Sequence, residues 1–264
     1  MLTNAAILRA ALRQSAYDSG CAPEDFLRAE NVFVESKPSA HAHRYLDLPF
    51  VCDIVSYGTN AVVSARADVL SRLEQTVAAC GEPYRLFETP ALYALNEALA
   101  PAGAKICFMA DYFLPDVDAV FTAELPCGFH IRVLEPEDFA SLYLPEWRNA
   151  LCARRKQFDV LAVGAYADDG ATLVALAGCS DDAADFYQIG VDVLPAFRRR
   201  GIASALTNRL ARECFARGKI PFYCAAWSNV RSVRNALRAG FKPGWVEVTA
   251  KPVAFVNELL AERT

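Results

Sequence analysis

Residues 193–204 read Val-Leu-Pro-Ala-Phe-Arg-Arg-Arg-Gly-Ile-Ala-Ser, and this stretch decides how the second half of the chain is interpreted. Apolar residues lead into a turn with three arginines and a glycine, and a helical pattern begins directly after Gly201. The first N–H groups of a helix lack partners inside the helix and carry the positive end of its dipole. Glycine lets the backbone approach an anion, and arginine suits phosphate geometry. The stretch therefore predicts a pyrophosphate-binding loop.

The three arginines have a simpler interpretation as a solvent-exposed charge run. Cations at a helix N-terminus oppose the helix dipole, however, so three in succession need a compensating anion. They also stand out against an acidic chain, because the net charge is −4. That charge argues against nucleic acid as the main partner, since proteins that bind nucleic acid usually show a basic excess.

Length and composition are those of a folded protein. The 264 residues suffice for one large domain or two of common size, and 54% of them are apolar, which allows a substantial core. The nine cysteines are widely spaced without a Cys-x-x-Cys pair, which predicts reduced thiols in a cytoplasmic protein. We find no signal peptide and no apolar stretch long enough for a bilayer, so we expect no membrane association.

The first half of the chain is predicted to mix helices and strands. A helix after Thr89-Pro90 is expected to end before Pro101, because proline fits the first turn of a helix and cannot continue one. The expected helices span residues 5–16, 68–79 and 91–100, and the expected strands span residues 50–55, 61–64 and 105–112.

The second half is predicted to form a sheet covered by helices, in an α/β or α+β arrangement. Residues 114–128 contain two prolines and several acids without periodicity, which predicts an N-terminal α/β domain at residues 1–125 and a second domain at residues 126–264. The expected strands span residues 129–133, 160–166, 172–179, 186–193, 221–226 and 245–249, and the expected helices span residues 135–144, 146–156, 200–217 and 230–239.

Two of these helices show a recognisable inner face. Ile202, Leu206 and Leu210 recur at every fourth residue, and Cys214 continues the row. In the next helix we expect Val233 and Leu237 to point inward. Gly240 follows that helix where a left-handed residue is favoured, and Phe241 comes next.

Three stretches of the C-terminal half resemble the GNAT superfamily of N-acetyltransferases. Residues 198–203 (RRRGIA) resemble the family's acyl-CoA loop, and residues 190–195 (GVDVLP) resemble the strand before it. Residues 229–232 (NVRS) with residues 238–241 (RAGF) resemble its downstream helix motif. The likeness covers roughly residues 129–250, and the whole layout resembles two-part bacterial GNAT acetyltransferases. It implies a C-terminal GNAT fold, with a mixed, mostly antiparallel central sheet flanked by helices.

The resemblance also implies an acyl-CoA-dependent N-acyltransferase. Acetyl-CoA is the expected co-substrate, and a primary amine of unknown identity is the expected acceptor. The pantetheine arm would lie along the strand, and the pyrophosphate would sit on the amides at the helix start. The implied cofactor-binding residues are Val191, Asp192, Val193, Arg198, Arg199, Arg200, Gly201, Ile202, Ala203, Ser204, Asn229 and Ser232.

The sequence departs from the family at the expected proton donor. Many members place a tyrosine seven residues after the asparagine, and here that position is Ala236. Tyr223 and Ser228 are the nearest candidates for protonating the leaving thiolate, although Tyr223 is equally explained as a strand core residue. Asp192 is the candidate general base, because it lies on the strand beside the expected thioester. An outward or helix-facing carboxylate explains Asp192 equally well.

Several alternatives stay open. A non-catalytic acyl-CoA sensor or interaction module would explain Ala236, and a longer acyl-CoA could replace acetyl-CoA. The N-terminal half could be a degenerate copy of the same fold or a lid that shapes the acceptor pocket. His41 and His43 suggest a metal, but no carboxylate or cysteine pattern completes the site, so we expect none. A homodimer is also left open.

Overall fold

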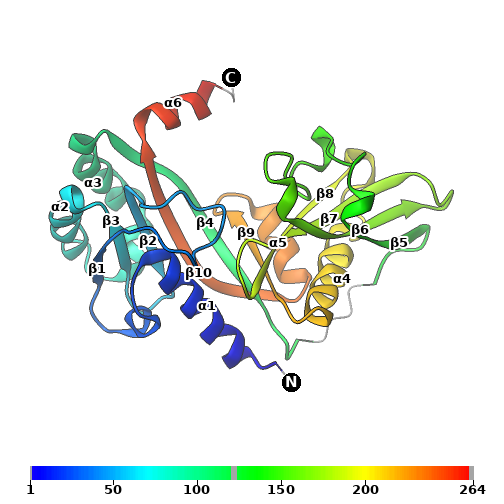
Figure 1. The fold of residues 1–264 in the computed structure, drawn as a ribbon, viewed down its shortest axis with the longest axis horizontal. Coiled ribbons are helices and arrows are strands. Elements are labelled where there is room, and N and C mark those ends of the chain that lie inside the picture. The colour runs from blue at the N-terminus through cyan, green and yellow to red at the C-terminus, as the bar shows by residue number, and fades with distance from the viewer. Residues whose placement is uncertain (1, 120–123, 262–264) are drawn as a thin grey trace. The chain divides into compact units, whose positions relative to one another are not determined.

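The computed structural model describes residues 2–119 and 124–261 (Figure 1). Contacts divide the chain into two compact units. Unit 1 comprises Met1–Ile7 and Phe113–Pro243, and unit 2 comprises Leu8–Tyr112 and Gly244–Thr264. Because compactness does not show that either part folds alone, the expected domains at residues 1–125 and 126–264 stay a prediction. Within the described residues, no helix has both the length and the apolar character that a bilayer span requires.

Unit 2 is built on a sheet whose strands follow the order β1-β3-β2-β10-β4. The pairs β3–β2 and β2–β10 are antiparallel, and the pair β1–β3 is parallel. Three elements, α1, β4 and β10, each contribute residues to both units. The helices are α1 (Asn4–Ser19), α2 (Ala67–Ala78), α3 (Thr89–Leu99) and α6 (Val253–Ala261), and the strands are β1 (Val32–Glu35), β2 (Cys52–Ser56), β3 (Val62–Ala65), β4 (Ala104–Pro115) and β10 (Phe241–Pro252).

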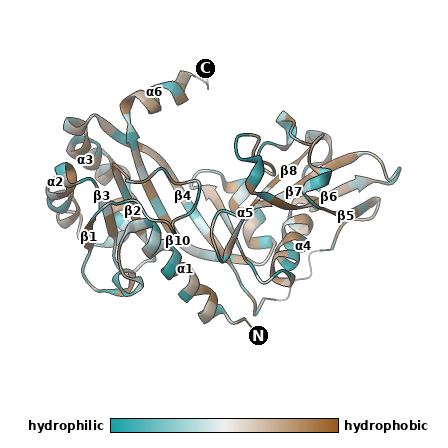
Figure 2. Ribbon diagram, in the orientation of Figure 1, coloured by the Kyte–Doolittle hydropathy of each residue, from teal (hydrophilic) through white to brown (hydrophobic). Residues whose placement is uncertain are grey.

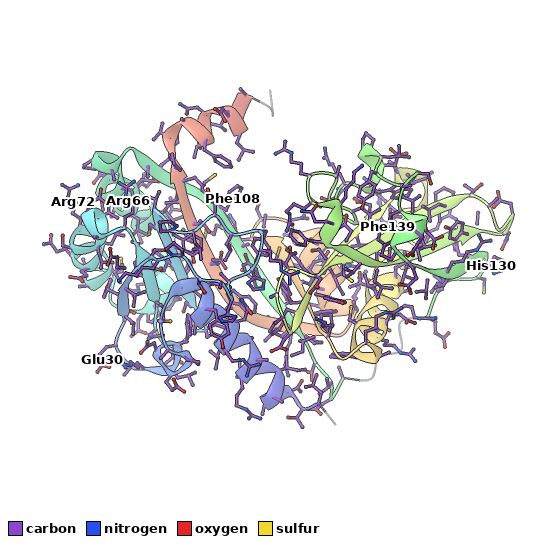
Figure 3. All side chains as sticks on the ribbon, viewed as in Figure 1. Glu30, Arg66, Arg72, Phe108, His130 and Phe139 are labelled. Carbon is purple, nitrogen blue, oxygen red and sulfur yellow. The ribbon has the colours of Figure 1, made fainter. Side chains whose placement is uncertain are left out.

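The core of unit 2 lies between that sheet and helices α2 and α3. Leu73 of α2 and Leu95 of α3 are buried against Ile54 and Val248 of the sheet. The outer face of α2 stays polar, as the exposed Arg72 illustrates (Figure 3). Since side chains alternate along a strand, the neighbours of Ile54, Asp53 and Val55, point to the opposite face.

Unit 1 contains a sheet in the order β9-β8-β7-β6-β5. All of its neighbouring strands run antiparallel except β8 and β9, which are parallel. Its elements are β5 (Phe129–Leu134), β6 (Asp159–Ala167), β7 (Leu173–Ser180), β8 (Phe186–Val193), α4 (Ile202–Ala216), β9 (Ile220–Ala226) and α5 (Val230–Arg238). The expected mixed, mostly antiparallel sheet flanked by helices is confirmed.

Helices α4 and α5 cover one face of this sheet. Ile202, Leu206, Leu210 and Cys214 are all buried in its core, so the predicted inner face of α4 is confirmed. The prediction for α5 is wrong at Leu237, which is 49% exposed. Small residues of α5, including Ala236, face the core instead. Apolar and polar residues alternate along the helices, as expected for helices that lie on a sheet (Figure 2).

The other face of the unit 1 sheet is covered by a long irregular segment, and here two predicted helices are wrong. Residues 135–144 and 146–156 form the short 3-10 turns η4 (Pro136–Asp138) and η5 (Pro145–Trp147) joined by irregular backbone. Carboxylates replace the missing helical hydrogen bonds, because Asp159 accepts from Cys152 N and Asp192 accepts from Asn149 N. Phe139 anchors the segment and is 2% exposed (Figure 3).

Candidate active site

Strands β8 and β9 separate part-way along their length. Their parallel pairing runs from Phe186 opposite Ile220 to Ile189 opposite Tyr223. On its other side, β8 continues to pair with β7 as far as Val193. Residues 190–193 of β8 therefore have a ladder partner on one side only within the described part of the chain. A one-sided strand edge can accept the main chain or amide groups of an extended ligand.

The loop after β8 leads from this open edge to the start of α4. Arg199 and Gly201 both have left-handed backbone, with φ of 63° and 85°. Among the described residues, the amides of residues 199–204 have no backbone acceptor, and the first helical bond runs from Ala205 N to Gly201 O at 3.2 Å. Unpaired amides at a helix start, together with turns of this hand, form a concavity that attracts anions.

The three loop arginines are exposed but differ in what they contact. Arg198 donates from Nε to the carbonyl of Val193 at 3.0 Å, which fixes the loop to the end of β8. The Arg200 guanidinium lies 5.6 Å from the ring centre of Phe197. All three charges therefore stay at the rim of the loop, where a phosphate could reach them.

The face of β8 that points away from α4 packs against the irregular segment. Gly178 of β7 lies directly opposite Gly190 of β8. A Cβ at Gly190 would lie 1.8 Å from the carbonyl oxygen of Asn149, and a Cβ at Gly178 would lie 2.1 Å from that of Ala150. Only glycine at both positions lets the segment lie flat on the strands.

Asp192 holds this segment in place. Its Oδ2 accepts from Asn149 N at 2.8 Å and from Ala150 N at 3.0 Å, and its Oδ1 accepts from Asn149 Nδ2 at 2.6 Å. The carboxylate thus lies on the face away from α4, and three N–H donors occupy its two oxygens. These contacts favour a positioning role, while the catalytic role expected for Asp192 stays a prediction.

Tyr223 ends the paired part of β9, at the point where the two strands separate. Its ring is buried against Phe113 and Phe241, and its hydroxyl is 2.8 Å from Ser232 Oγ. Burial raises the pKa of Tyr223, and the hydrogen bond with Ser232 partly opposes that shift. The phenol is therefore protonated at neutral pH and is placed as a potential proton donor.

The remaining expected residues lie around this centre. Asn229 caps α5 by accepting from Ser232 N at 3.2 Å. Ser228 lies exposed in the turn between β9 and α5. Ala236 is fully buried in the core. The side chains of Val191 and Val193 pack on the core of unit 1, and the Val193 carbonyl already accepts from Arg198.

Two site residues had been missed in the sequence. Asn235 is buried in α5 and joins both helices, since its Oδ1 accepts from Ser204 Oγ and its Nδ2 donates to Thr207 Oγ1, each at 3.0 Å. A polar residue on the inner side of a helix was the available signal. Asn149 gave no signal, because its partner Asp192 lies 43 positions away.

His130 lies outside this centre. His130 lies on β5, which β6 and β7 separate from β8, and its nearest acid is Asp168 at 3.9 Å (Figure 3). Among the described residues, no group of three His, Cys, Asp or Glu side chains is placed to hold a metal ion.

Comparison with known proteins gives the family. The sequence profile described as GNAT acetyltransferase matches residues 106–244, just over half of the 264 residues. The chain belongs to the GNAT acetyltransferase family. The matched range contains the strand edge, the arginine loop and α5, and therefore every GNAT site residue expected from the sequence. No protein of curated function matches the chain.

Solved GNAT structures resemble this GNAT chain at low identity. A GCN5-related N-acetyltransferase-like protein from Streptococcus suis is 18% identical over 61% of this chain and 68% of its own, with a TM-score of 0.44. GCN5-related N-acetyltransferases from Kribbella flavida and Sphaerobacter thermophilus are 20% and 17% identical, with TM-scores of 0.46 and 0.45. These two matches cover 59% and 61% of this chain but only 62% and 56% of the solved ones.

Proposed function

We propose that unit 1 is an acyl-CoA-dependent N-acetyltransferase that passes an acetyl group from acetyl-CoA to a primary amine. The observation that carries this proposal is the one-sided pairing of residues 190–193 in β8, which leads directly to the loop at Gly201. A pantetheine arm has amide groups that can bond to such an edge, and its pyrophosphate fits the unpaired amides at the start of α4.

The reaction needs a proton to move from nitrogen to sulfur. The neutral amine attacks the thioester carbonyl carbon, an amide bond forms, and the carbon–sulfur bond breaks. The nitrogen loses one proton and the thiolate gains one, so an incoming ammonium ion also releases a proton to solvent. In this scheme Tyr223 protonates the thiolate, in place of the tyrosine that Ala236 replaces. Peptide N–H groups of β8 at the separation point would polarise the carbonyl.

In the same scheme Asp192 is a positioning residue. Its three bonds to Asn149 and Ala150 hold the irregular segment over Gly190, beside the strand where the thioester would lie. The acceptor amine would then meet a rigid wall on this side of β8, and rigid walls favour productive orientation.

A second function, a non-catalytic acyl-CoA sensor, is favoured by one specific observation. Three N–H donors already engage the carboxylate of Asp192, the residue expected to act as the general base. A sensor would bind acetyl-CoA by the same loop and edge without turning it over.

The experiment that separates these functions joins calorimetry with a thiol-release assay. Acetyl-CoA should bind the purified chain, and one class among small amines, polyamines, peptide N-termini and lysine peptides should accelerate CoA release. Tight binding without acceleration by any amine supports the sensor and counts against the enzyme. Failure to bind any acyl-CoA would overturn both.

A matched pair of variants tests the loop. Arg200→Glu combined with Gly201→Glu places two negative charges at the expected pyrophosphate and should weaken acetyl-CoA binding at least ~100-fold, since each bond to a charged group contributes about 1.5–3 kcal/mol. Arg212→Glu makes the same charge reversal on an exposed position of α4 and should change affinity little. Unchanged affinity in the double variant would overturn the cofactor assignment.

A further inference from the structure

Unit 2 contains a cavity that the proposed transfer reaction does not use. Its walls come from the last turn of α1, residues 43–50, β2 and β10 (Figure 1). All residues that line it belong to unit 2. Asp18, Asp53 and Glu247 bring three carboxylates to this cavity from three different elements.

Two of these carboxylates share one hydroxyl. Asp53 is 2% exposed and lies directly opposite Thr249 on the neighbouring strand, whose Oγ1 donates to Asp53 Oδ1 at 2.8 Å. The same Oγ1 is 3.4 Å from Glu247 Oε1. Because a hydroxyl has a single proton, Thr249 can donate to only one of the two acids.

The third carboxylate belongs to the end of helix α1. Asp18 accepts from His43 N at 2.8 Å, and its Oδ2 is 2.6 Å from His43 Nδ1. It lies in the last turn of α1, which contains no basic residue. The C-terminal end of a helix carries partial negative charge, so the dipole of α1 adds to the charge of the three acids.

A further polar atom in the cavity wall supplies an independent sign of a ligand. Ser19, the final residue of α1, lines the cavity and is 2% exposed. Its Oγ has no hydrogen-bond partner among the described residues. A buried hydroxyl without a partner is costly, and its lone pairs suit an N–H donor.

Aromatic rings make the rest of the wall rigid. Trp245 is stacked between Tyr57 and Tyr112, with ring centres 5.5 Å and 4.6 Å away. Trp245 and Tyr112 also donate hydrogen bonds to Glu247. The carboxylate of Glu247 is therefore held in a fixed orientation.

The charges around this cavity favour a cation. Burial raises the pKa of Asp53 and raises that of Glu247 to about 7, and repulsion from Asp18 adds to both shifts. The positive groups that oppose these shifts are Lys251, which acts on Asp53, and His43, which acts on Glu247. A bound cation would stabilise the charged forms of both acids.

The size of the cavity selects the kind of cation. The cavity volume is about 10 Å³, which is roughly the room for one water or one ammonium group. We propose that this cavity binds a primary ammonium group, either free ammonium or the end of an organic amine, through Asp18, Asp53, Glu247 and Ser19.

The test is a titration of the full chain at pH 8, without acyl-CoA and at constant ionic strength set with sodium chloride. Methylammonium should raise the melting temperature saturably, while tetramethylammonium, which has no N–H and exceeds the available room, should not. Stabilisation by ammonium but not by methylammonium would assign the site to the free ion. Because no acyl-CoA is present, the result is independent of the proposed transferase activity.

Three variants make the test specific. Glu247→Gln keeps the shape and removes one charge, and should weaken methylammonium binding about tenfold or more. Ser19→Ala should weaken it about fivefold with little effect on folding. Glu258→Gln removes an exposed carboxylate on α6 and should leave binding unchanged.

The outcomes that overturn the proposal are equally specific. They are equal stabilisation by tetramethylammonium, no stabilisation by either ammonium or methylammonium, or unchanged binding in both cavity variants. Near-ultraviolet circular dichroism checks that Glu247→Gln is folded. If it is not, the Ser19→Ala titration decides the question.

Discussion

Replacement of Asp192 tests how the irregular segment is held over β8. In Asp192→Ala all three hydrogen bonds to Asn149 and Ala150 are lost, and their N–H groups are left to solvent. A hydrogen bond contributes a net ~1 kcal/mol, and exposed ones contribute less, so we expect a loss of about 2 kcal/mol in the free energy of unfolding. For a chain of this size that corresponds to a fall of roughly 4–8 °C in melting temperature.

Asp192→Asn separates positioning from base catalysis. Its carbonyl oxygen can still accept the two backbone bonds that Oδ2 accepts, and the Asn149 amide can turn to accept from the new NH₂ group. We therefore expect a loss of about 1 kcal/mol or less and a pH–rate profile of unchanged shape.

The assays are thermal unfolding and the pH dependence of kcat/KM with the amine found by the thiol-release screen. Glu146→Gln, an exposed carboxylate in turn η5 of the same segment, is the matched control and should change neither. If Asp192→Asn keeps full stability but loses ~100-fold or more in rate, together with the acidic limb of its profile, Asp192 is the general base and the positioning argument fails. Full stability in Asp192→Ala would show that the three hydrogen bonds of Asp192 do not hold the irregular segment in place.

Three further predictions concern other parts of the chain. Tyr223→Phe should lower kcat by ~100-fold with little change in acetyl-CoA affinity, since only the proton donor is removed, and rates of mutant and wild type measured with the same amine check this. Gly201→Ala should lower the free energy of unfolding by ~1 kcal/mol, because Gly201 has a φ of 85°, and should weaken acetyl-CoA binding measured by calorimetry. The control Gly81→Ala, at φ 73° in unit 2, should lower stability by the same amount without weakening that binding. Stability of the wild type should fall as the pH rises from about 5 to 7, because the pKa of Glu247 is raised to about 7 in the folded state and folding takes up a proton. In urea titrations at several pH values, Glu247→Gln should remove up to ~3 kcal/mol of this pH-dependent change in the free energy of unfolding.

The parts of unit 1 that were predictable are those defined by short-range patterns. The inner face of α4 follows from a period of about four residues, which Ile202, Leu206 and Leu210 display within one segment. The loop before it combines a glycine with a helix start, and the structure gives Gly201 the left-handed backbone that only glycine adopts at low cost. Both features depend only on neighbours in the sequence.

The segment from 135 to 156 could not be predicted for the same reason. Its apolar spacing is compatible with helices, but the groove that receives it exists only when Gly178 and Gly190 are paired across two strands. Its amides are then taken by Asp159 and Asp192, which come later in the chain. A local pattern contains none of these partners, so local propensity was overruled by tertiary contacts.

Charges that oppose a helix dipole mark both of the sites proposed for this chain. At the start of α4, Arg198–Arg200 place positive charge where the dipole is positive, and at the end of α1, Asp18 places negative charge where the dipole is negative. Each charge is unfavourable toward the dipole of its helix, and a ligand of opposite sign would offset that cost. The first was visible in the sequence because three arginines adjoin one glycine. The second became visible only when β2 and β10, far apart in the chain, brought Asp53 and Glu247 to the same end of α1.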